Sequence, residues 1–228
     1  MNLEYYIKKN NIKTKVTRGR YISLNIAPNG QITLKHPSKI SKSTLMSFLI
    51  EKEQWIEEKK KNIIRNFPQK LEFIDGEIIP IFGNSLRIQL STDHSITEKN
   101  ITFKNSKSKT AKLKNAKKYL IKLLEQETKP WIKFYTNEMK TKVNTVRIKV
   151  MKSLWGSCSS ENKISLNLSL IHCPLFVIKY IIVHELSHTI EHNHSAKFWK
   201  IVSEHCANFK EAEKWLKTEG KYIIYYLN

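Results

Sequence analysis

Residues 180–194 constrain the fold more than any other stretch of this chain. They read YIIVHELSHTIEHNH, an apolar run followed by four histidines and two glutamates. We expect a helix that opens near Pro174 and runs through this segment, with its apolar residues buried. Residues four apart lie on one face of a helix, so the imidazoles of His184 and His188 can reach the same ion. The segment therefore predicts a buried helix that presents two histidines together.

Two more histidines follow, and helix geometry decides which of them can complete a metal site. A rise of about 1.5 Å per residue puts His192 about 12 Å along the axis from His184. Zinc–nitrogen bonds of about 2.1 Å require the ligating nitrogens to lie within about 3.5 Å of one another. We therefore expect the helix to break, with Asn193 in the left-handed conformation, so that His194 closes the site. The prediction is Zn²⁺ held by His184, His188 and His194, with His192 a solvated residue at the helix end.

Glu185 directly follows the first histidine and is expected to play a different role. It lies one position round the helix from His184, beside the ion, with its carboxylate free to take a proton from water. Three protein ligands leave a fourth position open, which is typical of a catalytic zinc site, whereas structural zinc is normally closed by four protein ligands. We therefore predict that Glu185 is a catalytic general base and not a ligand.

The first part of the chain reads as β-rich. Alternating apolar residues on both sides of Pro28–Gly30 predict a β-hairpin within residues 15–36. Apolar residues then recur at helical spacing over residues 41–64. Ser41 or Ser43 can cap the start of that helix.

The remaining patterns predict an α+β fold in two domains. In chain order they are short strands in 73–90 and 101–104, a long helix to about residue 142, strands at 146–151 and 163–170, and short helices at 196–206 and 211–218. The polar, Lys-rich run 105–118 marks a boundary or an exposed helix start. We therefore expect a β-rich, basic N-terminal domain with one helix (1–108) and a mostly helical domain with a small sheet (109–228).

The net charge of +20 is unevenly distributed. Residues 1–150 hold 31 Lys and Arg against 13 Asp and Glu, a balance of +18, whereas residues 151–228 hold 9 against 7, a balance of +2. Such a basic part favours an acidic partner such as nucleic acid. However, 35 of the 40 basic residues are Lys and five are Arg, and phosphate and base recognition favours the forked guanidinium of Arg. A nucleic-acid partner is therefore kept as an alternative, and solvated surface lysines are the favoured interpretation.

Cysteine usage and hydropathy predict a cytoplasmic protein with no membrane partner. No stretch approaches the roughly 18 consecutive apolar residues that a membrane span needs. The N-terminal sequence MNLEYYIKKNNIK lacks the apolar core and small-residue cleavage site of a secretory signal. Cys158, Cys173 and Cys206 are an odd number of cysteines without a Cys-x-x-Cys pair, which fits free thiols in a reducing compartment.

Five motifs, in this order, resemble those of the YgjP-like metallopeptidases, which are zincins related to the SprT and WLM groups. They are WGSCSS at 155–160, LNLSLI at 166–171, Pro174, HELSH at 184–188 and NHSAKFW at 193–199. A weaker likeness extends through the N-terminal hairpin and covers nearly the whole chain. The resemblance implies a zincin-like helical domain acting on a peptide or protein substrate. It also implies His184, His188 and His194 as zinc ligands and Glu185 as the base.

The favoured function is therefore a zinc-dependent metallopeptidase that cleaves peptide bonds with water activated by Glu185. A second hypothesis keeps the same residues but assigns a phosphoanhydride or nucleotide hydrolase, whose substrate is recruited by the basic N-terminal part. A third is a nucleic-acid-associated protein with a metal site. The open coordination position counts against a purely structural metal in that third class.

Five further residues stand out in the motifs. Trp155 and Trp199 are expected to be core aromatics that pack against the helix. Cys158 has no sequence feature that supplies a base beside it, and is expected to be a small buried residue without a catalytic role. Ser195 is expected to cap the helix that follows it. His172 is a candidate for stabilising an oxyanion, on its proximity in sequence.

Overall fold

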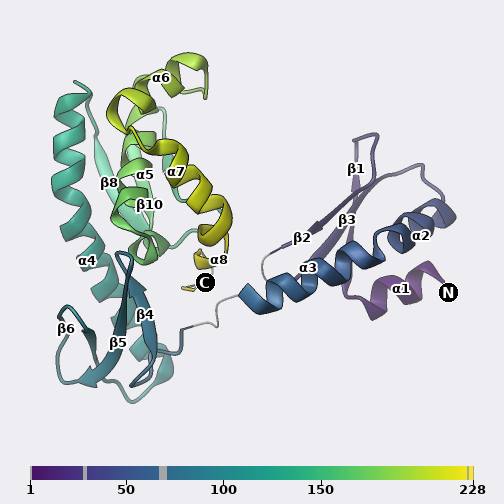
Figure 1. Cartoon of the computed structure of the whole chain (residues 1–228), viewed down its shortest axis with the longest axis horizontal. Coiled ribbons are helices and arrows are strands. Elements are labelled where there is room, and N and C mark those ends of the chain that lie inside the picture. Colours follow the sequence, from purple (N-terminus) through teal and green to yellow (C-terminus); the bar gives the residue numbers. More distant parts are fainter. Residues whose placement is uncertain (1, 28–29, 67–70, 225, 228) are drawn as a thin grey trace. The chain divides into compact units, whose positions relative to one another are not determined.

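The chain forms two compact units, Met1–Phe67 and Pro68–Asn228 (Figure 1). The structure is a computed structural model that describes residues 2–27, 30–66, 71–224 and 226–227. The predicted α+β fold is confirmed, since helices and three small mixed sheets make up the chain. Within these described ranges, no helix is both long enough and apolar enough to cross a membrane.

The first unit packs helices against a three-stranded sheet of order β1-β3-β2. Its elements are α1 (Leu3–Lys9), β1 (Ile12–Thr17), β2 (Ser23–Ile26), β3 (Ile32–Pro37), α2 (Lys42–Glu51) and α3 (Glu53–Asn66). Strand β3 pairs antiparallel with β2 and parallel with β1. The core between sheet and helices includes Ile32, Leu34, Leu49 and Ile56, all almost fully buried.

Two predictions for this unit can be compared with the structure. The antiparallel pairing of β2 with β3 confirms the hairpin, while residues 28 and 29 of its turn lie outside the described residues. The predicted helix over 41–64 is two helices, since α2 ends at Glu51 and α3 begins at Glu53. Ser41 is the cap, because its Oγ accepts a hydrogen bond of 3.0 Å from the Thr44 amide.

The second unit contains two sheets and the longer helices. The first sheet has the order β4-β5-β7-β6 and the second the order β8-β10-β9. The elements are β4 (Ile78–Ile81), β5 (Asn84–Ser91), β6 (Ser95–Ile96), β7 (Asn100–Lys104), α4 (Lys109–Glu138), β8 (Thr145–Lys149), β9 (Gly156–Cys158), β10 (Lys163–Asn167), the 3₁₀-helix η1 (Leu168–His172), α5 (Leu175–Ser187), α6 (Ala196–His205), α7 (Phe209–Trp215), the π-helix η2 (Leu216–Gly220) and α8 (Lys221–Ile223).

One hydrophobic core runs through this unit from the first sheet to helix α5. It joins Ile88 and Phe103 of the sheet, Leu120 of α4 and Val183 of α5, all fully buried. Helix α4 lies beside α5 (Figure 1). Strands β4–β7 therefore pack with the helical part of the chain, and the division between compact units falls at 67/68, whereas the sequence pattern placed a domain boundary at 108/109.

One helix and one strand in this unit end earlier than predicted. Helix α4 runs through Pro130 but ends at Glu138, before the expected position near residue 142. The strand expected over 163–170 ends at Asn167, where the chain turns into η1. The Asn167 side chain accepts a hydrogen bond of 3.1 Å from the Ser169 amide, which caps this turn.

Asn167 also fixes the segment that leads into β9. Its side chain is fully buried, and its Nδ2 donates to the carbonyl oxygens of Met151 (2.8 Å) and Leu154 (2.7 Å). Its backbone amide donates to the carbonyl of Trp155 at 2.9 Å. Buried amide groups that are paired in this way resist movement, because breaking them leaves unsatisfied polar atoms. The start of β9 is thus held firmly against β10.

Candidate metal centre

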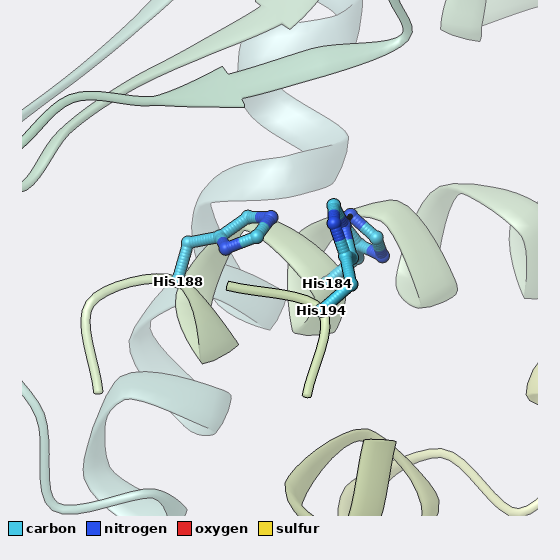
Figure 2. Close-up of side chains that lie close together, drawn as sticks. All are labelled: His184, His188 and His194. Atoms are coloured by element: carbon cyan, nitrogen blue, oxygen red, sulfur yellow. Dashed lines mark hydrogen bonds between the residues drawn. The ribbon is translucent and has the colours of Figure 1, made fainter. Parts of the chain in front are cut away.

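Three histidines from the end of α5 and the loop after it converge. One ring nitrogen each of His184, His188 and His194 can be chosen so that all three atoms lie within 4.8 Å of one another. The Nε2 atoms of His184 and His194 are 3.1 Å apart. Figure 2 shows the ring of His188 directed toward the other two rings. The structure therefore brings together the three histidines that the sequence pattern selected, and it leaves the exposed His192 out of the group.

The helix ends earlier than predicted, and the expected role of Asn193 is wrong. Helix α5 stops at Ser187 with His188 as its C-cap, and Asn193 is not among the residues with positive φ. The reversal is made instead by a turn, in which the amides of Ile190 and Glu191 donate to the carbonyl of Ser187 at 3.1 and 2.9 Å. His192 consequently lies beyond the helix and not at its end.

The predicted cap on the following helix is confirmed. Ser195 is the N-cap of α6, and its Oγ accepts a hydrogen bond of 3.3 Å from the Phe198 amide. Because His194 immediately precedes this cap, the start of α6 fixes the backbone that carries the third imidazole. The buried Phe198 then places its ring with its centroid 4.6 to 5.0 Å from those of the three imidazoles.

The surroundings keep two of the imidazoles neutral. The pKa of His184 is lowered to about 3, mainly by burial and further by His188 and His194. The pKa of His188 is also lowered, chiefly by burial. Neutral imidazole has a free nitrogen lone pair and is the form that binds metal ions. Three imidazole donors match the ligand chemistry of Zn²⁺, so the residues present fit a transition-metal ion.

Tyr180 contacts the far side of the His184 ring and was missed from the sequence. Its hydroxyl lies 3.4 Å from Nδ1 of His184, which leaves Nε2 of that ring facing His194. The Nδ1 of His188 is occupied similarly, 3.3 Å from the backbone carbonyl of Glu191. Partners on one ring nitrogen orient an imidazole and fix its tautomer. The detectable signal was spacing, because Tyr180 lies four residues before His184 on one helix face.

Glu185 lies beside this cluster but is not a member of it. Its side chain is buried, with the residue 4% exposed, and Oε2 has no hydrogen-bond partner in the described part of the chain. Burial raises the pKa of Glu185 to about 8. A cation at the histidines would lower this pKa, since an opposite charge nearby favours the ionised form. A buried carboxylate without a partner fits a group that exchanges protons with a bound reactant.

A pocket of about 340 Å³ opens beside Glu185 and His184. Its walls come from residues 153–156, from α5 and from the α7–η2 region, and they are largely apolar. Trp155 lines the pocket and packs against the core, and Trp199 packs against the core as well. The prediction that both tryptophans are core aromatics is therefore confirmed, and Trp155 also faces the pocket.

The suggestion that His172 stabilises an oxyanion is wrong. His172 is 1% exposed and packs in the core, where its Nδ1 donates to the carbonyl of Pro80 at 2.7 Å. Burial lowers its pKa to about 4. A side chain sealed in this way cannot touch a substrate. Its proximity in sequence to α5 did not bring it to the site.

The three cysteines are free thiols, as predicted. The pKa of the Cys158 thiol is raised, first by burial and then by the negative charge of Glu185. A raised pKa keeps the sulfur protonated, and the thiol is a poor nucleophile. This supports the prediction that Cys158 has no catalytic role, but the residue is half-buried and not buried as expected.

We expect that Cys158→Ser, Cys173→Ala and Cys206→Ala each leave turnover within a few-fold of wild type. Cys173 is fully buried, so its replacement lowers stability through lost packing by about 1 kcal/mol. Turnover measured on folded, metal-loaded variants checks this. A Cys158 variant that folds and binds metal but has no activity would restore the thiol to the mechanism.

Comparison with known proteins identifies the family of the chain. A family model described as the YgjP-like metallopeptidase domain matches residues 20–219. Among solved structures, the crystal structure of the metallopeptidase zymogen of Pyrococcus abyssi abylysin is similar, with 20% identity over 40% of this chain and 95% of that chain and a TM-score of 0.35. No curated protein matches. Because the family model covers most of the sequence, this protein belongs to the YgjP-like metallopeptidase family.

Proposed function

We propose that the protein is a zinc-dependent peptidase in which His184, His188 and His194 hold the ion and Glu185 is the general base. The observation that carries the proposal is one arrangement: three converging imidazoles with a buried, unpartnered carboxylate beside them. Membership of a metallopeptidase family supports a metal ion and a peptide or protein substrate. The all-imidazole ligand set favours zinc over magnesium or calcium, which prefer oxygen ligands.

Each residue has a defined task in this proposal. A zinc ion supplies Lewis acidity, which polarises the scissile carbonyl and makes water more acidic. Glu185 removes a proton from the attacking water and delivers it to the leaving amine. Tyr180 and the carbonyl of Glu191 keep the His184 and His188 rings in the orientation that directs their other nitrogens toward the ion. The buried environment of α5 strengthens these electrostatic effects.

The phosphoanhydride or nucleotide hydrolase remains an alternative that uses the same residues, and the family match favours the peptidase. The experiment that separates them offers the zinc-loaded protein a peptide library and a nucleotide panel in parallel. Cleavage of peptides alone, abolished in Glu185→Gln, supports the proposal. Hydrolysis of nucleotides alone would overturn it.

The free thiols of the three cysteines support a cytoplasmic location.

We expect the basic charge to give no measurable affinity for nucleic acid, even at low salt. Among the 40 basic residues only five are Arg, and Lys is the ordinary solvated surface charge. Titration of the full-length protein with single- and double-stranded DNA and RNA at two salt concentrations checks this. Binding that weakens steeply with salt would contradict it, since each neutralised phosphate releases about one counterion.

A further inference from the structure

Gly156, the first residue of β9, lies directly against the Glu185 side chain. A Cβ atom added to Gly156 would lie 2.5 Å from Oε1, 2.7 Å from Cγ and 2.8 Å from Cδ of Glu185. Carbon atoms make favourable contacts with their neighbours at about 3.5 to 4.0 Å. Position 156 therefore has no room for any side chain while Glu185 keeps its position.

Backbone conformation does not explain the glycine. Gly156 is not among the glycines with positive φ, which are Gly30, Gly76 and Gly83. It lies in a strand, paired antiparallel with Leu166 of β10, where other residues are normally favoured over glycine. The reason for a glycine at position 156 is steric: the Glu185 side chain occupies the space that a side chain at position 156 would fill.

The strand cannot easily move away from the helix. Asn167 holds the preceding segment through its bonds to the carbonyls of Met151, Leu154 and Trp155. On the other side, Glu185 belongs to a helix whose neighbouring residues Val183 and Leu186 are fully buried. With both backbones fixed, a methyl group at 156 would be accommodated by displacing the Glu185 carboxylate.

No hydrogen bond within the described part of the chain holds Oε2 of the Glu185 carboxylate in place, so this group is free to be displaced. Its Oε2 is buried without a partner in the described part of the chain. The contact surface provided by Gly156 is thus a main determinant of where the carboxylate lies.

We propose that Gly156 is a positioning residue: its bare backbone sets the place of the Glu185 carboxylate beside the histidine cluster. This inference rests on the proposed function in one respect, the role of Glu185 as the base. The contact itself depends only on the fold. A displacement of about 1 Å at a reacting group can reduce turnover about 100-fold.

The first experiment compares Gly156→Ala with wild type and with Gly19→Ala. Gly19 is the matched control, because an added Cβ there would meet nothing closer than Thr17 Oγ1 at 3.5 Å. We expect Gly156→Ala to bind one zinc ion with wild-type affinity while its kcat falls about 100-fold at nearly unchanged KM. Gly19→Ala is expected to match wild type. Wild-type kcat in folded Gly156→Ala would overturn the proposal.

The second experiment is a double-mutant cycle on stability, which needs no activity. We expect Gly156→Ala to lower the denaturant midpoint of the full-length protein, and to lower it much less in a Glu185→Ala background, where the crowded atoms are gone. If Gly156→Ala fails to fold but the double variant Gly156→Ala/Glu185→Ala folds, the outcome also supports the proposal. Equal destabilisation in both backgrounds, or failure of both variants to fold, would overturn the proposal. If the wild-type protein proves inactive on peptides, the proposed function fails. The stability cycle would still show whether Gly156 and Glu185 are in contact.

Discussion

Glu185→Gln is expected to keep its metal and to lose between about 10²- and 10⁴-fold in kcat. The amide has nearly the shape of the carboxyl group but cannot accept a proton from water. Because Glu185 lies outside the histidine cluster, the substitution removes no ligand. Metal content by elemental analysis and peptide turnover on the same sample measure both halves of this prediction.

A matched control is available on α6. Glu204→Gln makes the same chemical change at an exposed carboxylate that lies 4.0 Å from Lys200, and it should alter neither metal content nor turnover. Retention of near wild-type turnover in Glu185→Gln would remove this residue from the mechanism. Loss of metal together with activity would instead indicate that the carboxylate helps to hold the ion.

His194→Ala is expected to abolish stable metal binding, whereas His192→Ala leaves it intact. The two histidines are separated by one residue, yet only His194 lies with His184 and His188. Loss of a direct ligand should exceed the 10- to 100-fold weakening that loss of an outer hydrogen-bond partner produces. Zinc affinity measured by competition with a chelating dye tests this. The opposite pattern, with metal lost from His192→Ala and kept by His194→Ala, would show the ligand assignment to be wrong.

Features encoded by neighbouring residues were predicted well. The antiparallel pairing of β2 and β3 followed from alternation around an Asn-Gly turn, and the caps Ser41 and Ser195 followed from residue type. The histidine cluster also belongs to this class. Its three members lie within eleven residues, and the group found is the one that the sequence selected, although the helix ends at Ser187 and His192 lies beyond it.

Features that depend on distant parts of the chain were missed. The parallel pairs β1–β3 and β8–β10 join strands separated by long connections, and no local pattern specifies their register. The packing of β4–β7 into one core with α5 is a long-range arrangement that the composition of the Lys-rich run does not specify. Gly156 could be read as part of a motif, but the need for a glycine there appears only once Glu185 is placed against it.

The proposed ligands are divided between the end of a helix and the loop that follows it. His184 and His188 belong to the end of a largely buried helix, while His194 is exposed and follows a tether of five residues. In the terms of coordination chemistry, the helix would be a preorganised two-armed chelator, and the tether would add a third arm. Closing so short a tether costs little chain entropy. The rate at which the proposed ion exchanges with solvent should therefore be set by the local opening of the loop that carries His194. The core of the unit stays folded during this opening.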